Sequence, residues 1–350
     1  MASEGRAIAV LGATGYTGRL VCEAARELGL SLRLLGRDEQ ALREAAHAGE
    51  EVAVADAADH ASVLAALEGA FAVIHTAGPF LKKGFAAVDA AIAAGVHYVD
   101  SSTEQAYSRP IYERFGSRAA ERGLVLLTAF ANSPGDFAAE IAAEGLDALD
   151  EVIVANDQSG LVPALSRGSR RTLAEIMEQP QWAWENGVLL PSRFGATTRR
   201  VRFPSGERTV VEWPGPEPLA VPRHADVRTV RSYARAPRAA AAVGRFAGPF
   251  ASVVRLSTKV GREGPSPEKR RKARFTVVAE ARGSGGGRRA TILGRDVYGT
   301  AALLLARAAQ GLAGDEVLER GALAPAEGFE SRRFLGRAAP LLQLESVVEL

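Results

Sequence analysis

The strongest chemical signal is a glycine-rich string near the start of the chain, Gly12-Ala13-Thr14-Gly15-Tyr16-Thr17-Gly18. It follows an apolar run at residues 7–11 and precedes an amphipathic stretch at 18–28, the strand–turn–helix context that a dinucleotide-binding loop requires. Glycines permit a tight turn and a close approach of the backbone to a pyrophosphate, whose charge is met by amides at the helix start. The predicted phosphate contacts are Gly12, Thr14, Gly15, Tyr16, Thr17 and Gly18, with a merely structural turn as the alternative.

The end of the second predicted strand determines the expected cofactor. NAD enzymes usually place an acidic residue there to hold the ribose 2′-hydroxyl, whereas this chain has Gly36-Arg37. A small residue followed by a guanidinium leaves room for a 2′-phosphate and offers it a bidentate donor. Asp38 comes next, but Arg37 is nearer to the strand end. We therefore predict NADP(H) rather than NAD, with a solvated arginine at a helix start as the alternative for Arg37.

Polar or flexible segments also follow the third and fourth predicted strands. Asp56 comes after the third strand and is predicted to contact the adenine edge or, almost equally well, to cap a helix. The fourth strand leads into a short loop where the nicotinamide half of a dinucleotide normally lies. The predicted cofactor contacts in that loop are Ala77, Gly78, Pro79 and Phe80. His75, just before them, is interpreted as a strand residue facing the core, with proton transfer as the lesser alternative.

Four residues near the carboxyl ends of the strands could handle a proton. Tyr98 and Asp100 end the fifth predicted strand, Glu104 follows it, and Asp136 opens the segment after the sixth. A carboxyl or phenol group there can deliver the proton that a reduction needs, or organise a water that does. We predict Tyr98, Asp100, Glu104 and Asp136 as catalytic candidates. Their spacing specifies no acid–base pair, and Asp136 could equally cap a helix.

Other kinds of site lack the residues they need. Short-chain dehydrogenases use a tyrosine followed by a lysine four residues later, and no tyrosine of this sequence has that spacing. The histidines are scattered, and the single cysteine, Cys22, falls within a predicted helix and is interpreted as a core residue. No metal site is therefore expected. Arg170-Arg171-Thr172, after a loop at 160–163, is the one basic cluster considered for an acidic substrate.

Six strand–helix units must position these residues. Apolar runs at residues 7–11, 31–35, 52–55, 71–76, 96–100 and 124–128 alternate with amphipathic helical stretches. Fully apolar strands separated by helices indicate a parallel sheet covered on both faces. Right-handed crossovers then bring the carboxyl ends of the strands to one shared edge. We predict an α/β fold with a Rossmann-type, doubly wound parallel sheet.

The sequence pattern changes after about residue 130. Period-two alternation with aromatic and β-branched residues at 193–211 and 227–233, and a hairpin pattern at 274–293, predict a second α/β domain. Its sheet is expected to be mixed and largely antiparallel. From residue 297 the pattern is again helical. We predict an NADP-binding domain at 1–130, a substrate domain at 131–293, and a helical segment at 294–350 that packs back on the first domain.

Composition and charge restrict the partners. The chain has 350 residues, of which 47% are hydrophobic and 24% charged, an ordinary globular content. Lys and Arg number 43 against 41 Asp and Glu, so no broad attraction to nucleic acid or anionic lipid is expected. We find no signal-peptide pattern and no apolar stretch of membrane-spanning length. The expectation is a soluble cytoplasmic protein, and a homodimer is compatible with the sequence.

Several segments together resemble the saccharopine dehydrogenase-like oxidoreductase family, including its trans-acting enoyl reductase branch. They are residues 12–18 with Gly36-Arg37, 77–80 with Gly84, 94–100, 133–136, and Phe203-Pro204 followed by 213–215 and 220–224. The resemblance implies a Rossmann domain, a substrate domain with a mixed sheet, and a C-terminal helical segment. The family often has Gly-Glu after the fifth strand, where this chain has Ser102-Thr103-Glu104. Residues that bind the amino-acid backbone in saccharopine-forming enzymes are not identifiable, so lysine-pathway activity is not expected.

The motifs and the resemblance predict an NADP(H)-dependent oxidoreductase that reduces a C=C or C=N bond of a small or carrier-bound metabolite. A non-catalytic NADP-binding regulator is the alternative, because a Rossmann fold does not by itself imply chemistry. Oxidation of an amino acid, which is the opposite direction of reaction, is a third hypothesis.

Overall fold

The computed structural model describes residues 6–158, 165–235 and 263–350. Its contacts divide the chain into two compact units, neither of which is a single stretch of sequence. Unit 1 contains residues 1–102, 107–131 and 298–329, and unit 2 contains residues 103–106, 132–297 and 330–350. The chain therefore passes from one unit to the other five times.

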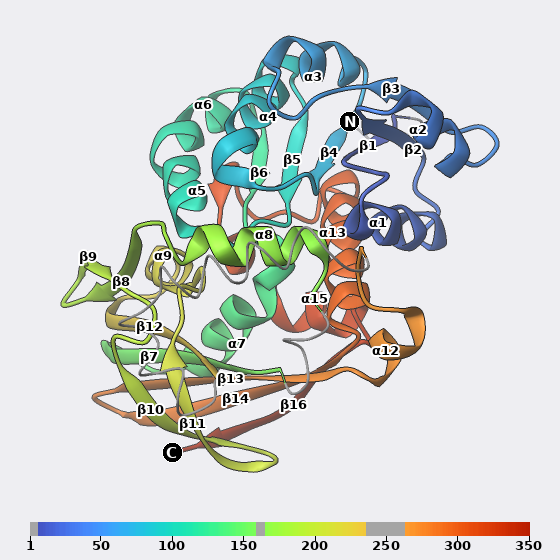
Figure 1. The fold of residues 1–350 in the computed structure, drawn as a ribbon. Coiled ribbons are helices and arrows are strands. Elements are labelled where there is room, and N and C mark those ends of the chain that lie inside the picture. Colours follow the sequence, from blue (N-terminus) through green and yellow to red (C-terminus); the bar gives the residue numbers. More distant parts are fainter. Residues whose placement is uncertain (1–5, 159–164, 236–262) are drawn as a thin grey trace. The chain divides into compact units, whose positions relative to one another are not determined.

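Unit 1 is built on a seven-stranded sheet in which every pairing is parallel, with the order β15-β6-β5-β4-β1-β2-β3 (Figure 1). The strands are β1 (Ile8–Leu11), β2 (Leu32–Gly36), β3 (Glu51–Val54), β4 (Ala72–His75), β5 (His97–Asp100), β6 (Val125–Leu127) and β15 (Gly321–Leu323). The order reverses direction between β1 and β4, as in doubly wound sheets. The predicted Rossmann-type sheet is confirmed, and all six predicted strands are present.

The crossover helices of unit 1 follow the strands in alternation. They are α1 (Tyr16–Glu27), α2 (Glu39–Ala45), α3 (His60–Ala66), α4 (Phe80–Ala94), α5 (Gln105–Pro110), a π-helical turn (Ile111–Phe115) and α6 (Gly116–Glu121). The helices α13 (Val297–Ala313) and α14 (Pro325–Gly328) come from the last part of the chain. Short polar caps start two of the crossovers: Asp38 accepts a bond from the Ala41 amide, and Asp59 from the Ala61 amide.

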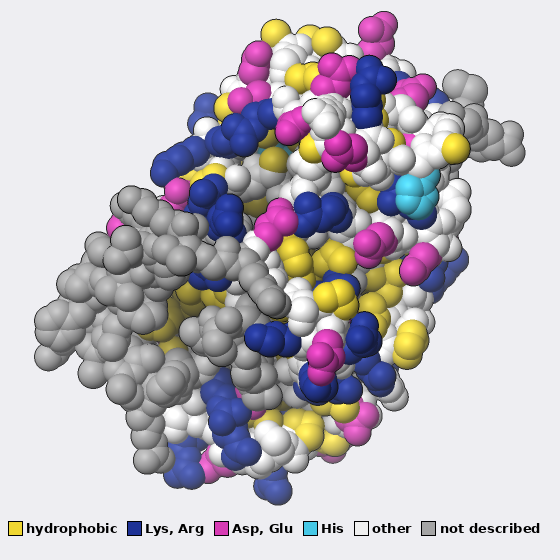
Figure 2. All heavy atoms as spheres, turned by 45° about the vertical axis from the view of Figure 1, so that its right-hand side comes forward, with side chains coloured by type: hydrophobic (Ala, Val, Ile, Leu, Met, Phe, Trp, Pro, Cys, Tyr) yellow, Lys and Arg dark blue, Asp and Glu magenta, His cyan; other side chains and the backbone are white. Residues whose placement is uncertain are grey.

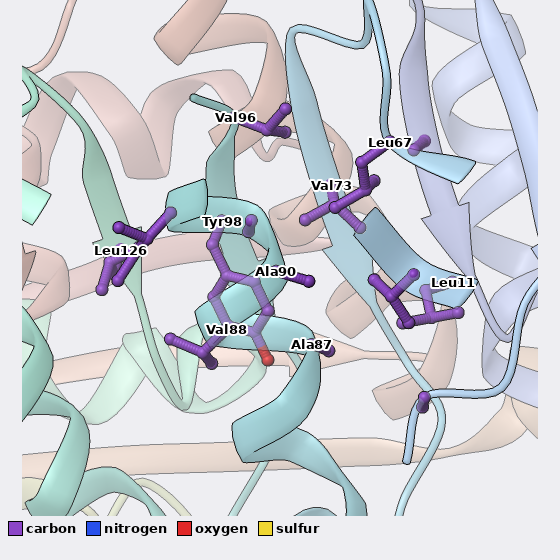
Figure 3. Close-up of a cluster of buried hydrophobic side chains, with 14 of the residues drawn as sticks. Leu11, Leu67, Val73, Ala87, Val88, Ala90, Val96, Tyr98 and Leu126 are labelled. Atoms are coloured by element: carbon purple, nitrogen blue, oxygen red, sulfur yellow. The ribbon is translucent and has the colours of Figure 1, made fainter. Parts of the chain in front are cut away.

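Both faces of this sheet are buried. On one face, alternate residues such as Leu11, Val73 and Tyr98 pack against α3 and α4. Figure 3 shows the phenol ring of Tyr98 among aliphatic side chains, with its hydroxyl oxygen pointing away from Val96. Residues of the opposite alternation, such as Val10 and Ile74, are equally inaccessible. Burial on both faces explains why these strands read as continuous apolar runs.

Unit 2 is built on a nine-stranded mixed sheet. Seven strands follow the order β10-β11-β12-β7-β13-β14-β16, and the hairpin β8–β9 joins through β12 (Figure 1). The strands are β7 (Leu149–Asp157), β8 (Gln181–Glu185), β9 (Val188–Ser192), β10 (Thr198–Phe203), β11 (Gly206–Glu212), β12 (Val227–Arg235), β13 (Arg274–Gly283), β14 (Gly286–Arg295) and β16 (Leu342–Glu349). Only β7 and β12 pair in parallel. The mixed, largely antiparallel sheet that we predicted is confirmed.

One helix covers the centre of this second sheet. It is α7 (Ser133–Ala143), which contacts β7, β13 and β14 and is fully buried along most of its length. The helix α15 (Ser331–Arg337) packs beside it and against β16. The other helical segments in the described part of unit 2 are α8 (Arg167–Ile176), α9 (Glu217–Ala220), a 3-10 turn (Val221–Arg223) and α12 (Pro267–Lys272).

The tail of the chain differs from the helical segment that we predicted for residues 294–350. It includes two strands, β15 and β16, which extend the first and the second sheet respectively. Residues 342–346 alternate buried or half-buried positions with exposed ones, which is the period of a strand with one covered face. The predicted division at residues 130 and 293 into separate domains stays a prediction.

Charges of both signs are interspersed on the surface. Figure 2 shows Lys and Arg side chains beside Asp and Glu on one face of the molecule, in keeping with 43 basic and 41 acidic residues. No helix in the described part of the chain combines the length and apolar character needed to cross a membrane.

Candidate functional site

The loop between β1 and α1 has a geometry that only glycine permits at two positions. Gly12 has φ of +91°, and a Cβ there would lie 2.9 Å from Thr76 Oγ1. A Cβ on Gly18 would lie 2.0 Å from the carbonyl oxygen of Gly12, so the helix packs directly onto the loop backbone. Gly15 is the N-cap of α1 and uses no side chain to satisfy the first amides of the helix. The loop therefore presents backbone N–H groups at a helix N-terminus, as an anion site does.

The other residues of this loop make contacts of their own near the end of β1. The backbone carbonyl of Thr14 accepts a bond from Arg19 at 2.5 Å. The ring of Tyr16 meets the ring of Tyr298 edge to face, with 5.1 Å between centroids. Thr17 lies in the first turn of α1 and is half-buried. The structure thus brings all six predicted phosphate contacts together in one turn.

The end of β2 separates the roles of two neighbouring charges. Asp38 is the N-cap of α2, and its carboxylate accepts the amide of Ala41 at 3.1 Å. Arg37 is exposed, and its side chain makes no ion pair or hydrogen bond with any residue that the structure describes. One oxygen of Asp38 thus serves the helix cap, whereas the guanidinium of Arg37 is available to an anion such as a phosphate.

Asp56 takes part in the turn that precedes α3. Its carboxylate accepts the amide of Ala58 at 3.1 Å, and its own amide donates to Ser62 Oγ at 2.9 Å. The N-cap of α3 is Asp59 rather than Asp56. Asp56 is half-buried, and its turn lies directly after β3, at the same sheet edge as the glycine loop. The adenine contact that we predicted for Asp56 stays a prediction.

The loop after β4 lies against the glycine turn. Thr76 donates its hydroxyl to the carbonyl of Leu11 at 3.1 Å, and Ala77 would meet a Cβ on Gly12 at 3.0 Å. The four predicted nicotinamide contacts grade from exposed to buried: Gly78 is exposed, Ala77 and Pro79 are half-buried, and Phe80 is buried. The structure therefore places residues 77–80 beside residues 12–18 at one sheet edge.

Tyr98 lies inside the core of unit 1. Its side chain is fully buried, and its hydroxyl is 2.8 Å from His75 Nδ1 and 2.7 Å from the hydroxyl of Tyr107. Burial raises the pKa of Tyr98 well above its usual value, and the neighbouring Tyr107 and Asp100 raise it further. The phenol therefore stays protonated at neutral pH. His75 is a buried strand residue, as predicted.

Asp100 joins the ends of β5 and β6. Its Oδ1 accepts the amides of Ser102 and Ala129, both at 2.9 Å, while Oδ2 is buried without a hydrogen bond to any described residue. Desolvation raises the pKa of Asp100 to about 6, although hydrogen bonds from Ser102, Ala129 and Thr128 oppose that rise. Ala129 has φ of +55°, so the carboxylate holds a turn in an unusual conformation.

Glu104 belongs to unit 2 although it follows β5 closely in sequence. It is fully buried, and its carboxylate lies 3.4 Å from the amide of Thr103. The next residue, Gln105, anchors this short segment within unit 2. Its side-chain amide donates to the carbonyl of Gly215 at 2.7 Å and accepts the amide of Trp182 at 2.8 Å.

Asp136 forms a pair with a histidine that our sequence reasoning did not select. Oδ1 of Asp136 lies 2.8 Å from Nε2 of His224. The Asp136 side chain is 2% exposed and that of His224 is 10% exposed. Asp136 is in the first turn of α7, but the N-cap of that helix is Asn132 rather than Asp136. The segment 220–224 carried the family resemblance, and that was the one sequence signal that could have pointed to His224.

A second missed residue is Glu217, at the start of α9. Its Oε2 accepts the hydroxyl of Ser232 at 2.5 Å. A Cβ on Gly135 would lie 2.1 Å from Oε1, and a Cβ on Gly215 would lie 2.2 Å from Oε2, so two glycines enclose the carboxyl group. Desolvation raises the pKa of Glu217 to about 7, and the charge of Asp136 raises it further. Nothing in the sequence separates this glutamate from a surface residue.

The candidates thus fall into two groups. Unit 1 brings together the glycine loop, Arg37, the loop at 77–80, Tyr98 and Asp100. Unit 2 contains Glu104 and the Asp136–His224 pair. The described residues include no group of three or more His, Cys, Asp and Glu arranged to hold a metal ion. Cys22 is buried in α1, and burial raises its pKa to about 12.

The basic cluster considered for an acidic substrate lies on α8. Arg170 donates to the carbonyl of Leu165 at 3.0 Å, and its Nε and Nη2 are buried without a hydrogen bond to described residues. The preceding loop at 160–163 lies outside the described residues. A role in substrate binding therefore stays a prediction.

Comparison with known proteins adds sequence evidence for the first third of the chain. Residues 4–117 match the NmrA-like family. A lipid droplet localized protein of Caenorhabditis elegans is 33% identical over 136 residues, which cover 35% of this chain and 32% of that protein. A trans-acting enoyl reductase of Mycobacterium ulcerans is 30% identical over 139 residues, covering 37% of this chain and 33% of the reductase. The match thus spans about a third of the length of these curated relatives.

A solved structure extends the likeness to the whole chain. The apo form of saccharopine dehydrogenase (L-Glu forming) from Saccharomyces cerevisiae superposes with a TM-score of 0.63 over 99% of this chain and 100% of the yeast chain, at 12% identity. The chain has the saccharopine dehydrogenase fold. The predicted resemblance to saccharopine dehydrogenase-like oxidoreductases is confirmed, by sequence over about a third of the chain and by fold over 99% of it.

Proposed function

We propose that this protein is an NADP(H)-dependent oxidoreductase of the saccharopine dehydrogenase-like type. The observation that carries the proposal is the loop between β1 and α1, where Gly12 and Gly18 leave space that any Cβ would fill. Backbone amides at the start of α1 can then meet a pyrophosphate closely. These residues fit a dinucleotide, and the NmrA-like match covers the same segment.

The preference for NADP(H) over NAD(H) rests on the end of β2. Arg37 is exposed and engages no other described side chain, whereas Asp38 is occupied as the cap of α2. A guanidinium there would bind a 2′-phosphate, and the nearest carboxylate, Asp38, already accepts a backbone amide through one oxygen. Asp56 would contact the adenine, and residues 77–80 would line the nicotinamide.

The proposed reaction is reduction of a C=C or C=N bond in a small or carrier-bound metabolite. The cofactor supplies the hydride, while the protein positions the acceptor carbon and excludes water. Among the predicted proton donors, Asp136 has the geometry that favours acid–base work, because it orients the imidazole of His224. Asp100 and Glu104 are fully buried, and Asp100 already accepts two backbone amides.

The range of substrates and the setting are also part of this proposal. The enoyl reductase among the relatives supports a C=C acceptor, and the proposed substrate is small or carrier-bound. We propose a cytoplasmic protein that requires no nucleic acid partner, and a homodimer is its proposed assembly.

Cofactor binding tests the proposal directly. We would titrate NADPH and NADH into the purified protein and follow nicotinamide fluorescence, with wild type, Arg37→Ala and Arg43→Ala in parallel. We expect NADPH to bind at least about tenfold more tightly than NADH, which corresponds to about 1.4 kcal/mol. Arg37→Ala should lose that margin. Arg43, an exposed arginine of α2 that pairs with Glu39, is the matched control and should keep it.

Other outcomes of the titration would contradict the proposal or part of it. Binding of neither nucleotide would reduce the glycine loop to a structural turn and overturn the proposal. Equal affinity for both nucleotides would overturn the choice of cofactor alone. A regulator without chemistry is the second candidate, since a fold of this kind can bind NADP without a reaction. Turnover with NADP+ and an amine substrate would instead indicate amino-acid oxidation.

A further inference from the structure

Three buried polar rings lie directly beneath the loop that we propose for the nicotinamide. They are His75 at the end of β4, Tyr98 in β5 and Tyr107 in α5, and all three have no exposed surface. His75 and Asp100 are register partners across β4 and β5, so Tyr98 lies two residues before the partner of His75 and on the same face. The chain continues from His75 straight into residues 76–80.

The rings form a continuous hydrogen-bonded chain. Nδ1 of His75 lies 2.8 Å from the hydroxyl of Tyr98, which lies 2.7 Å from the hydroxyl of Tyr107. The far end is fixed by packing: a Cβ on Gly84 would lie 2.5 Å from the Tyr107 ring, so that glycine makes room for it. Phe80 contacts both ends, with ring centroids 4.9 Å from His75 and 5.5 Å from Tyr107.

The chain has a direction that depends on the tautomer of His75. Burial lowers the pKa of His75 to about 3, so the ring is neutral and carries one N–H. If Nδ1 accepts from Tyr98, the N–H is at Nε2, and Tyr107 must donate to Tyr98. The backbone of Ala77 opposes this fall in the pKa of His75. Nε2 has no hydrogen bond to a described residue, and it belongs to the ring next to the loop.

Packing alone does not require these groups. Their neighbours in the core are mainly apolar, and the side chains labelled around Tyr98 in Figure 3 are all Ala, Val or Leu. Burying an imidazole and two phenols costs free energy unless each is hydrogen-bonded, and phenylalanine could fill much the same volume. A fully buried, hydrogen-bonded network does, however, hold a group in one position more rigidly than apolar packing. The group held here is His75, which directly precedes the 76–80 loop.

We propose that the His75–Tyr98–Tyr107 chain positions the loop at residues 76–80 to receive the nicotinamide half of the cofactor. This proposal rests on the proposed function. The glycine loop and Arg37 would bind the adenosine half, and the buried chain would determine how well the other half is held. Tyr98 then acts through His75 as a positioning residue, and it does not deliver the proton itself.

Two probes separate the two halves of the cofactor. NADPH carries the nicotinamide, and 2′-phospho-ADP-ribose carries the same phosphates without it. We would measure the Kd of both by calorimetry for wild type, Tyr98→Phe and Tyr107→Phe. We expect each variant to bind NADPH about tenfold more weakly and 2′-phospho-ADP-ribose within about twofold of wild type. Tyr112→Phe, which removes a half-buried hydroxyl elsewhere in unit 1, should change neither affinity.

A second measurement uses the wild-type protein, in case a variant does not fold. We would follow the imidazole nitrogens of His75 by NMR in protein labelled with 15N-histidine. NADPH should shift these resonances, and 2′-phospho-ADP-ribose should leave them in place. His75→Asn, which can place a polar atom near Nδ1, should retain more NADPH affinity than His75→Leu.

The outcomes distinguish this inference from the proposed function. If wild type binds neither probe, the proposed function fails and the inference falls with it. If wild type binds both but Tyr98→Phe changes neither, the function stands and the positioning role is overturned. Equal weakening of both probes would also overturn it, because that pattern indicates general damage to unit 1.

Discussion

Asp100 in unit 1 and Glu217 in unit 2 both carry buried carboxyl groups, but different hydrogen-bond donors compensate the cost of burying them. Asp100 receives two backbone amides on one oxygen, whereas Glu217 receives one serine hydroxyl and is enclosed by two glycines. The pKa of Asp100 is raised to about 6 and that of Glu217 to about 7. Two backbone amides stabilise the charged form of Asp100, whereas the hydroxyl of Ser232 and the backbone of Glu217 itself leave Glu217 closer to its neutral form, because burial and the charge of Asp136 oppose them.

The comparison predicts that filling the space beside the Glu217 carboxyl group will destabilise the protein strongly. Gly135→Ala would place a Cβ 2.1 Å from Oε1 of Glu217, and neither α7 nor α9 can move without disturbing buried neighbours. We expect a loss of unfolding free energy of about 3 kcal/mol or more, measured by chemical denaturation. Gly285→Ala is the control, because a Cβ there meets nothing within 4 Å. Equal stability of the two variants would show that the carboxyl group is not confined.

The protonation of Glu217 should give stability a dependence on pH. A carboxyl group whose pKa is about 7 in the folded state and 4.5 unfolded holds its proton longer when folded. The contribution of Glu217 to the unfolding free energy is therefore complete below pH 4.5. It falls as pH rises to 7, by about 3 kcal/mol at most. Glu217→Gln should remove this dependence on pH. The melting temperature of the variant, relative to that of wild type, should therefore rise from pH 5 to pH 8. A constant difference across that range would contradict the raised pKa.

Asp100 should instead be sensitive to loss of its acceptor oxygen. Asp100→Ala leaves the amides of Ser102 and Ala129 buried without their partner, which should cost about 2 kcal/mol. Asp100→Asn keeps an acceptor oxygen and should recover most of that loss at neutral pH. Thermal unfolding of the two variants tests this difference. If asparagine were as damaging as alanine, the charge rather than the amide bonds would be what matters.

The smallest loss of unfolding free energy is expected at an exposed carboxylate, Asp38. Asp38→Ala removes the cap of α2 and should cost about 1 kcal/mol. Because the cap occupies Asp38, the variant should leave the preference for NADPH over NADH unchanged. A variant that gained or lost that preference would show that Asp38 takes part in cofactor recognition, and the separation of roles at the end of β2 would be wrong.

The two units also differ in how much of them could be predicted from sequence. In unit 1, the central strands are apolar on both faces and the predicted strands alternate with helices, so period and order predicted the sheet and the edge that carries Gly12 and Arg37. The strand β15 was not predicted. It has only three residues and pairs with β6, which is almost two hundred residues earlier in the sequence, so no local sequence pattern predicts it.

Unit 2 depends more on contacts between distant residues. The antiparallel hairpin β13–β14 was visible because its two strands adjoin in sequence. The pairing of Asp136 with His224 joins residues 88 positions apart, and no spacing rule predicts it. Glu217 is on a four-residue helix among prolines, where composition suggests an exposed joint. Its burial follows from the glycines at 135 and 215, which only the folded arrangement brings to it.

The late arrival of β15 has a consequence for how the protein is made on the ribosome. The edge of β6 has no partner until residues 321–323 emerge, after all of β7 to β14 has been synthesised. Chains fold largely from the N-terminus during synthesis, and an unpaired strand edge invites pairing with another chain. The nascent first sheet must therefore wait with one open edge while nearly two hundred further residues are translated. A fragment that stops after β6 would keep that edge open permanently.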